Sequence, residues 1–209
     1  TFLRSDIWLL VLGMLCFAVG ILYSAGPLPI SRTPFGEVFS GLFMGFFIPF
    51  LVVHASIYDQ YPITLALTEE RVVFTLDWTL VLPIFLSSLP AVFCIANIML
   101  ANNICDVEDD FTNRRYTLPI QIGREKALIL FAAIYALTYL DIISCVVLGY
   151  LPVISLLALL PAVKVYSNVR AFFKLQTKKD TFALSVMNLM LIMFPIILSL
   201  LIAVIIKLF

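Results

Sequence analysis

One stretch of the sequence holds side chains whose types and spacing suit metal and phosphate chemistry. Asn102, Asp106 and Asp110 follow one another at intervals of four residues, and residues four apart lie on the same face of a helix. Asp109 lies close to that face, whereas Glu108 points away from it. The stretch therefore presents one amide and two or three carboxylates toward a single point.

Carboxylates held this close repel one another. At about 6 Å and an effective dielectric constant near 20, each pair costs roughly 3 kcal/mol, so a bound divalent cation, protonation or exposure to solvent must offset the repulsion. Mg²⁺ is usually bound by one or two carboxylates together with substrate phosphates. Arg114 and Arg115 follow directly, and basic groups beside carboxylates suit a shared phosphate partner. The alternative is a solvated loop with scattered charges.

A second candidate is Tyr23, which ends an apolar run. An aromatic side chain at the edge of a membrane is usually an interfacial anchor, and for Tyr23 an anchoring role and a functional role are both open. The Gly-Pro-Leu-Pro stretch at 26–29 follows it and favours a rigid, irregular loop. That loop would lie on the same side of the membrane as the acidic stretch.

The composition places these residues in a membrane protein. The chain has 209 residues, of which 63 % are hydrophobic and 12 % charged, whereas about a quarter of the residues in a soluble domain are charged. The net charge is zero, so no overall field attracts a nucleic acid. A soluble domain, a disordered chain and a nucleic-acid-binding protein are thereby excluded, and an all-α bundle of membrane-spanning helices remains.

The hydropathy pattern predicts six membrane-spanning helices in a single domain over residues 1–209. Each apolar run is long enough, at about 20 residues, to cross the hydrocarbon layer. The predicted spans are 7–23, 35–54, 78–103, 127–148, 151–169 and 183–208. Residues 149–152, Gly-Tyr-Leu-Pro, predict a tight turn between the fourth and fifth spans. The polar segment 57–77 is expected to be a loop or an interfacial helix.

The basic residues are distributed unequally between the two sides of this arrangement. Three of the 13 Lys and Arg residues fall on one side and ten on the other, which predicts that the first, third and fifth loops face the cytoplasm and both chain ends face outward. The three are Arg4, Arg71 and Lys207. The ten are Arg32, Arg114, Arg115, Arg124, Lys126, Lys164, Arg170, Lys174, Lys178 and Lys179.

These residues resemble those of a known enzyme family. The stretch NNICDVEDD at 102–110, with RYTLP at 115–119 and Ile-Gly at 122–123, resembles the second aspartate-rich motif of the UbiA-type membrane prenyltransferases. The double asparagine, together with LYSAGPLP at 22–29, is similar to the branch that acts on 1,4-dihydroxy-2-naphthoate in menaquinone biosynthesis. The resemblance extends over essentially the whole chain.

The resemblance implies a nine-helix bundle, of which the six spans here would be the last six. Two aspartate-rich motifs would bind Mg²⁺ and the diphosphate of a polyprenyl donor. Departure of the diphosphate would leave an allylic cation that alkylates the aromatic acceptor, with loss of the acceptor's carboxylate, to give demethylmenaquinone. The protein would lie in a bacterial cell membrane with its site facing the cytoplasm, in contact with membrane lipid and with no nucleic-acid partner.

Roles carried over by position follow from this resemblance. Asp106 and Asp110 match the catalytic aspartates that face Mg²⁺ and diphosphate, Asp109 would join them as a metal ligand, and Tyr23 matches a tyrosine near the reacting end of the cavity. The substrate-binding candidates are Asn102, Arg32, Arg114, Arg115 and Lys164. The family usually has Gly-Lys-Arg where this chain has Arg-Arg-Tyr at 114–116, so the basic role shifts by one residue.

One departure concerns the first aspartate-rich motif, which the sequence before Tyr23 does not contain. We therefore expect the chain to be a C-terminal portion of the enzyme that lacks about three helices and is inactive alone, although it could still bind Mg²⁺ weakly. Prenyl transfer by the purified 209-residue chain would contradict this expectation. Two alternatives stay open: a different aromatic acceptor such as 4-hydroxybenzoate, and a secondary transporter that uses Asp141 as a relay. The ordered face of Asn102, Asp106 and Asp110 argues against a non-catalytic scaffold, which has no need to offset the repulsion.

Overall fold

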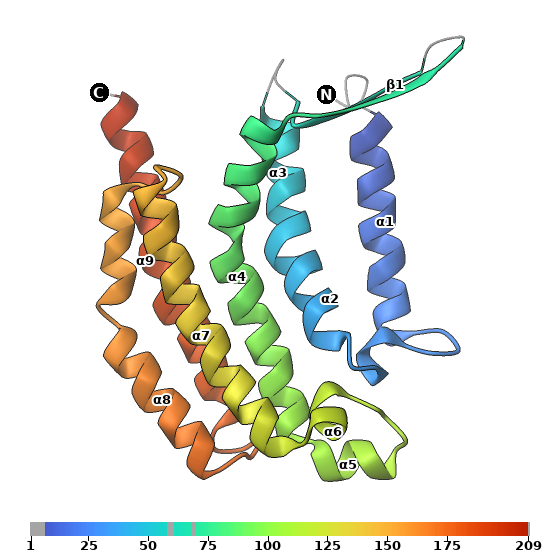
Figure 1. Cartoon of the computed structure of the whole chain (residues 1–209), viewed down its shortest axis with the longest axis vertical. Coiled ribbons are helices and arrows are strands. Elements are labelled where there is room, and N and C mark those ends of the chain that lie inside the picture. Colours follow the sequence, from blue (N-terminus) through green and yellow to red (C-terminus); the bar gives the residue numbers. More distant parts are fainter. Residues whose placement is uncertain (1–6, 58–60, 68–69, 209) are drawn as a thin grey trace.

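The apolar runs form long helices that lie side by side (Figure 1), because a backbone inside lipid must satisfy its own hydrogen bonds. The computed structural model describes residues 7–57, 61–67 and 70–208. Its helices are α1 (Ile7–Ser24), α2 (Gly36–Leu42), α3 (Ile48–Ser56), α4 (Trp78–Cys105), α5 (Val107–Thr112), α6 (Leu118–Ile122), α7 (Arg124–Val147), α8 (Ala162–Lys174) and α9 (Phe182–Leu208). Three short helical turns are η2 (Ile30–Arg32), η3 (Phe43–Phe47) and η4 (Val153–Leu159).

The expected all-α polytopic membrane bundle is confirmed. Among the described residues, five helical segments are long and apolar enough to cross a membrane, and α1 provides a shorter apolar helix. The five are Gly36–Ser56, Trp78–Cys105, Arg124–Val147, Val153–Lys174 and Phe182–Lys207. Each corresponds to one predicted span. The fourth segment, Val153–Lys174, extends beyond the predicted span 151–169, so Arg170 and Lys174 lie within α8 and not in the loop to which the sequence assigned them. Lys164, counted with the same loop although it falls inside the predicted span, also lies within α8.

The segment 57–77 contains a β-hairpin, and the prediction of a loop or an interfacial helix is wrong. Strands β1 (Ile63–Leu67) and β2 (Val72–Leu76) pair in antiparallel register, with Ile63 opposite Leu76. Their β-branched residues favour the extended conformation. Asp77 then begins α4, because its Oδ1 accepts the Thr79 N–H at 2.9 Å and caps the helix.

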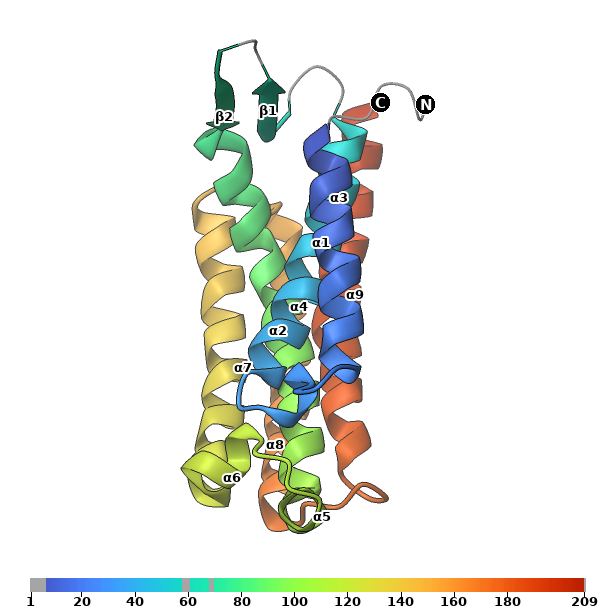
Figure 2. The ribbon, with the colours of Figure 1, turned by 90° about the vertical axis from the view of Figure 1, so that its right-hand side faces the viewer.

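The predicted alternation of loops between the two ends of the bundle is seen in Figures 1 and 2. The α1–α2, α4–α7 and α8–α9 connections share one end, called the inner end here, and the hairpin and the α7–η4 turn lie at the other. The predicted tight turn is present, with Gly149 at φ 76° and the Tyr150 N–H donating to the Cys145 carbonyl at 2.8 Å. Arg4, counted above as an outer residue, lies outside the described residues.

Helix α4 is central to the packing, with α2 on one side and α7 and α9 on the other (Figure 1). The largest buried side chains against it include Phe131 of α7 and Ile192 of α9. Interhelical hydrogen bonds and close contacts drive association inside lipid. Asn97 of α4 accordingly donates to the Phe131 carbonyl at 3.0 Å, and Asn168 of α8 donates to Asn188 of α9 at 2.8 Å.

Two glycines let α2 and the π-helical turn η3 approach the α4 backbone closely. A Cβ added to Gly45 would lie 2.5 Å from the Val92 nitrogen, and one added to Gly41 would lie 2.7 Å from the Val92 carbonyl oxygen. Small residues four apart allow this kind of contact between membrane helices. The contact brings the first turn of α2 against the inner end of α4, where the acidic stretch begins.

Substitution of Gly45 by Ala tests this contact. The new methyl group must displace the α4 backbone, so the free energy of unfolding should fall by roughly 1–3 kcal/mol. Reversible unfolding in mixed detergent–SDS micelles, followed by circular dichroism, measures the loss. Gly13→Ala is the matched control, since a Cβ there meets nothing within 4 Å, and it should leave stability unchanged or raise it by up to about 1 kcal/mol, because alanine favours the helix. Equal stability of the two variants would contradict the close packing.

Candidate functional site

The acidic stretch lies at a bend between α4 and α5. Asp106 separates the two helices with φ −101° and ψ 11°, and α5 runs across the inner end of α4 (Figure 1). The helical hydrogen bonds continue through the bend, from the Asp106 N–H to the Asn102 carbonyl at 3.2 Å and from the Asp110 N–H to the Asp106 carbonyl at 2.7 Å. The predicted four-residue spacing therefore persists, although the helix axis changes direction.

Asp106 is paired with a lysine from a distant part of the sequence. Lys178, in the α8–α9 connection, places its Nζ 2.7 Å from Asp106 Oδ2 and also donates to Asn102 Oδ1 at 2.7 Å. A single ammonium group therefore joins the carboxylate and the amide oxygen. The sequence placed Lys178 only among the inner basic residues, and nothing in its local pattern indicated this pairing.

Asp110 is paired with Arg115 and is 2 % exposed. Its Oδ1 lies 3.2 Å from Arg115 Nη1, and its Oδ2 accepts from Thr117 Oγ1 at 3.3 Å. Burial raises the pKa of the Asp110 carboxyl above its usual value, the Arg115 guanidinium opposes that rise, and the Asp106 carboxylate adds to it. The two predicted catalytic aspartates are thus close enough to interact, and each has its own basic partner.

Arg114 and Arg115 have different roles at the end of α5. Arg114 adopts a left-handed conformation with φ 54°. Its N–H donates to the Phe111 carbonyl at 3.2 Å, and the Arg115 N–H donates to the Asp110 carbonyl at 2.9 Å. This pair of bonds is a Schellman motif, which closes a helix C-terminus. Arg114 forms the turn with its side chain exposed, and the turn directs Arg115 back to Asp110.

The first inner loop is attached to this cluster through its backbone. The Tyr116 N–H donates to the Arg32 carbonyl at 2.9 Å, whereas the Arg32 side chain is exposed. Tyr23, at the inner end of α1, directs its hydroxyl group toward the Gly36 carbonyl at 3.5 Å. Gly36 begins α2, so this contact places Tyr23 beside the first turn of that helix.

Glu37, in that first turn, is a residue that the sequence analysis missed. It is 4 % exposed, and its Oε1 accepts from Asn103 Nδ2 at 2.8 Å. Asn103 Oδ1 in turn accepts a long hydrogen bond, 3.4 Å, from Asn102 Nδ2, so polar contacts run from Glu37 to Lys178. The other carboxylate oxygen, Oε2, is buried and has no hydrogen-bond partner among the described residues. The sequence did contain a signal for this residue: Glu37 is the single acidic residue in the predicted span 35–54, and an acid inside a membrane span is usually functional.

Two predicted site residues lie away from the cluster. Asp109 is exposed on α5, and Lys164 is exposed in the first turn of α8. Helix α8 lies at the edge of the bundle opposite α1 (Figure 1). Within the described ranges Lys164 forms no ion pair with Asp106 or Asp110, and no three His, Cys, Asp or Glu side chains gather to hold a metal ion. Two carboxylates and the Asn102 amide oxygen form the cluster.

An apolar cavity adjoins the polar cluster. Its volume is about 320 Å³, and it lies among α1, α2, η3 and α4. Tyr23 and Ser40 contribute polar atoms to its wall, and the remaining lining residues are Cys16, Val19, Gly20, Phe39, Phe43, Met44, Ile48 and Met99. A cavity of this size and character suits a small or elongated apolar ligand.

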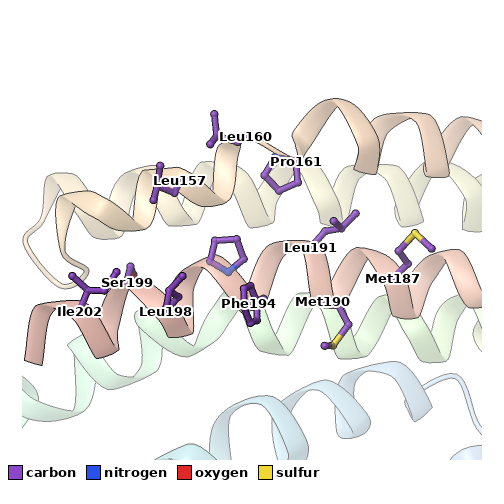
Figure 3. A pocket seen from close by; sticks show the side chains of 11 residues that line it. Leu157, Leu160, Pro161, Met187, Met190, Leu191, Phe194, Leu198, Ser199 and Ile202 are labelled. Carbon is purple, nitrogen blue, oxygen red and sulfur yellow. The ribbon is translucent and has the colours of Figure 1, made fainter. Parts of the chain in front are cut away.

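A larger hollow of about 660 Å³ lies on the far side of the bundle, where η4 ends and α9 contains Pro195 (Figure 3). Apolar side chains such as Leu160, Met190 and Phe194 line it, and no charged residue does. It therefore contains no charged group for the predicted chemistry.

Asp141, the residue that a transporter would use as a relay, lies toward the outer end of α7, where its carboxylate is 3.8 Å from Cys145 Sγ.

Removal of the Arg115 guanidinium should destabilise the folded protein, because the buried Asp110 carboxylate loses its charged partner. In Arg115→Met the folded protein disfavours ionised Asp110, so at pH 7 the free energy of unfolding should fall by about 1–3 kcal/mol. Because burial raises the pKa of the Asp110 carboxyl, this loss should shrink as the pH falls through that pKa and the group becomes neutral. Unfolding titrations between pH 4 and pH 8 measure it. Arg114→Gly is the control and should retain wild-type stability, because glycine readily adopts the left-handed turn.

The contact between Glu37 and Asn103 can be tested by a double-mutant cycle. Glu37→Ala or Asn103→Ala alone leaves a buried polar partner unpaired, which should reduce the free energy of unfolding by about 1–3 kcal/mol. The double variant should lose less than the sum of the two single losses. Unfolding in mixed micelles supplies all four values. Strict additivity would show that the two side chains do not interact.

Comparisons with known proteins give one relative and one family for the chain. The chain is 35 % identical over 145 residues to the 1,4-dihydroxy-2-naphthoate octaprenyltransferase of Bacillus subtilis (strain 168), an alignment that covers 69 % of this chain and 40 % of the relative. The chain thus spans less than half the length of that relative. No solved structure matches it significantly. The UbiA prenyltransferase family model matches residues 2–204, and the chain, an integral membrane protein, belongs to the UbiA prenyltransferase family.

Proposed function

We propose that the protein transfers a polyprenyl group from a prenyl diphosphate to an aromatic acceptor, and that the acceptor is 1,4-dihydroxy-2-naphthoate. Membership in the UbiA prenyltransferase family supports the reaction class, and the name of the Bacillus subtilis relative supports the acceptor. The product is then demethylmenaquinone, made during menaquinone biosynthesis.

The observation that carries this proposal is the pairing of two carboxylates with two basic side chains beside an apolar cavity. Asp106 and Asp110, with the Asn102 amide oxygen, supply hard oxygen donors that suit Mg²⁺ held together with substrate phosphates. Mg²⁺, when bound, supplies positive charge that stabilises the departing diphosphate. Arg115 and Lys178 are placed to contact phosphate oxygens through charge-assisted hydrogen bonds.

The prenyl chain and the acceptor are assigned to the apolar cavity next to Tyr23. The cavity excludes charged side chains, so an isoprenyl chain loses no hydrogen-bond partner by entering it. The Tyr23 ring lines the cavity, and the face of an aromatic ring stabilises a nearby cation. In this arrangement the allylic carbon reacts between the phosphate-binding end and the apolar cavity.

We further propose that the inner end of the bundle faces the cytoplasm of a bacterial cell. The basic residues of the first, third and fifth loops support this orientation, because positively charged loops are retained on the cytoplasmic side. The site would then draw a water-soluble acceptor and Mg²⁺ from the cytoplasm and the prenyl donor from the membrane.

An assay of the native polypeptide that contains this chain tests the proposal. In lipid vesicles with a polyprenyl diphosphate, Mg²⁺ and 1,4-dihydroxy-2-naphthoate, prenylated naphthoquinol should form, and Asp106→Asn should lower the rate by on the order of a hundredfold. Glu125→Gln, an exposed acid in the first turn of α7, is the control for loss of a carboxylate and should retain activity.

A parallel reaction with 4-hydroxybenzoate tests prenyl transfer and the identity of the acceptor separately. Product from 4-hydroxybenzoate alone would keep prenyl transfer and overturn the assigned acceptor. Folded protein that forms no product with either acceptor would overturn prenyl transfer itself. Omission of Mg²⁺ in parallel reactions tests the metal requirement.

A further inference from the structure

Lys178 contacts the same oxygen atoms that the proposed function assigns to Mg²⁺. Its Nζ lies 2.7 Å from Asp106 Oδ2 and 2.7 Å from Asn102 Oδ1. Mg²⁺ binds its oxygen ligands at about 2.0–2.1 Å, so the ammonium group and a metal ion cannot both bind these two oxygens directly from the same side. One cation must leave before the other can enter.

We propose that Lys178 is a positioning residue that occupies the divalent-cation position while the metal is absent and moves to the phosphate when the metal binds. The inference rests on the proposed function and adds to it an order of events. The ammonium keeps Asp106 and Asn102 aligned before substrate arrives, and metal entry releases that positive charge beside the diphosphate.

The loop around Lys178 has a fixed backbone from which its long side chain can move. The Thr177 N–H donates to Thr181 Oγ1 at 3.0 Å, and Thr177 Oγ1 donates to Asp180 Oδ2 at 2.9 Å. These bonds define the turn that precedes α9. The Lys178 side chain is 50 % exposed and carries its charge on a flexible four-carbon stem. In this same position Nζ also lies 5.9 Å from the centre of the Phe182 ring, a distance at which the face of an aromatic ring attracts a cation.

The other basic partner in the cluster is less able to move. Arg115 is bonded to Asp110 through its guanidinium group and also through its backbone N–H, which donates to the Asp110 carbonyl at 2.9 Å. Asp110 is buried, whereas Asp106 is partly exposed. Of the two ion pairs, the Lys178–Asp106 pair is therefore the one that an entering metal ion can open.

This exchange predicts how metal and phosphate affect one another. A divalent cation alone must break the Lys178 contacts and gains nothing in return from the displaced ammonium. With phosphate present, the displaced ammonium regains a charged partner. Metal and phosphate should therefore bind cooperatively, and Lys178 should account for part of that cooperativity.

Mn²⁺ binding to the native polypeptide that contains this chain, purified in detergent and followed by electron paramagnetic resonance, tests the inference without any activity assay. Without phosphate, Lys178→Met should bind Mn²⁺ about fivefold more tightly than wild type, because no ion pair has to be broken. Pyrophosphate should increase Mn²⁺ affinity more in wild type than in this variant. Lys179→Met removes the same charge from the neighbouring exposed residue and should behave as wild type.

Two further measurements test whether the change in Mn²⁺ affinity arises at Asp106 and whether the metal displaces the Lys178 amine. Adding Asp106→Asn to Lys178→Met should abolish the gain in Mn²⁺ affinity. In wild-type protein, Mg²⁺ should increase the reactivity of the Lys178 amine toward an acylating reagent while leaving that of Lys179 unchanged. Lys178→Gln replaces Lys178→Met if the latter does not fold.

Separate outcomes overturn the inference and the proposed function. Wild type that binds Mn²⁺ with pyrophosphate, together with a Lys178 variant of equal or lower Mn²⁺ affinity, would overturn the role of Lys178 alone. Persistence of the gain after Asp106→Asn would do the same. Failure of folded wild type and both Lys178 variants to bind Mn²⁺ even with pyrophosphate would overturn the metal-dependent function and the inference together.

Discussion

The pairing of Asp106 and Asp110, each with its own basic side chain, is the interaction on which the inner end of the bundle depends. Asp106 and Asp110 would repel each other by roughly 3 kcal/mol at about 6 Å without Lys178 and Arg115. A bound cation, protonation and exposure to solvent were the ways to offset that repulsion expected from sequence. The protein uses its own cations. The Lys178–Asp106 pair fastens the α8–α9 connection to the end of α4, and the Arg115–Asp110 pair fastens the α5–α6 loop to α5.

Helix α4 gives this cluster a firm support. The glycine contact with Val92 holds α2 against α4 without intervening side chains, and the hydrogen bond from Asn103 to Glu37 fixes the rotation of the two helices near the site. A site is held accurately when neighbouring hydrogen bonds lock the orientation of its groups. The two adjacent asparagines divide this work. Asn103 holds α2 through its hydrogen bond to Glu37, and Asn102 orients Lys178 through the hydrogen bond that it accepts.

Features set by local sequence were predicted well, and those set by tertiary packing were not. Hydropathy located the spans and the four-residue spacing located Asp106 and Asp110, because both signals lie within one segment. The partners Lys178 and Glu37 lie 76 and 66 positions from the asparagines that they contact, and no pattern within a single segment reveals such pairs. Lys164 was counted with the fifth loop although it falls inside the predicted span 151–169, and it lies in the first turn of the amphipathic α8.

The π-helical turn η3 constrains how this region can change in length. Glu37, Gly41 and Gly45 follow at four-residue intervals, and in an α-helix such positions drift around the axis by about 40° at each step. The wider turn at Phe43–Phe47 reduces that drift, so that the acid faces Asn103 while both glycines face α4. A π-helical turn takes up one more residue than an α-helical turn, so deletion of a single residue from η3 would restore ordinary helical winding and leave the outer half of the helix at nearly its present rotation. Deletion of a residue from α2 between Glu37 and Gly41 would instead rotate both glycines by about 100° relative to the acid, and one of the two alignments would be lost. The wide turn is therefore a part of this helix that can accommodate a change in residue number.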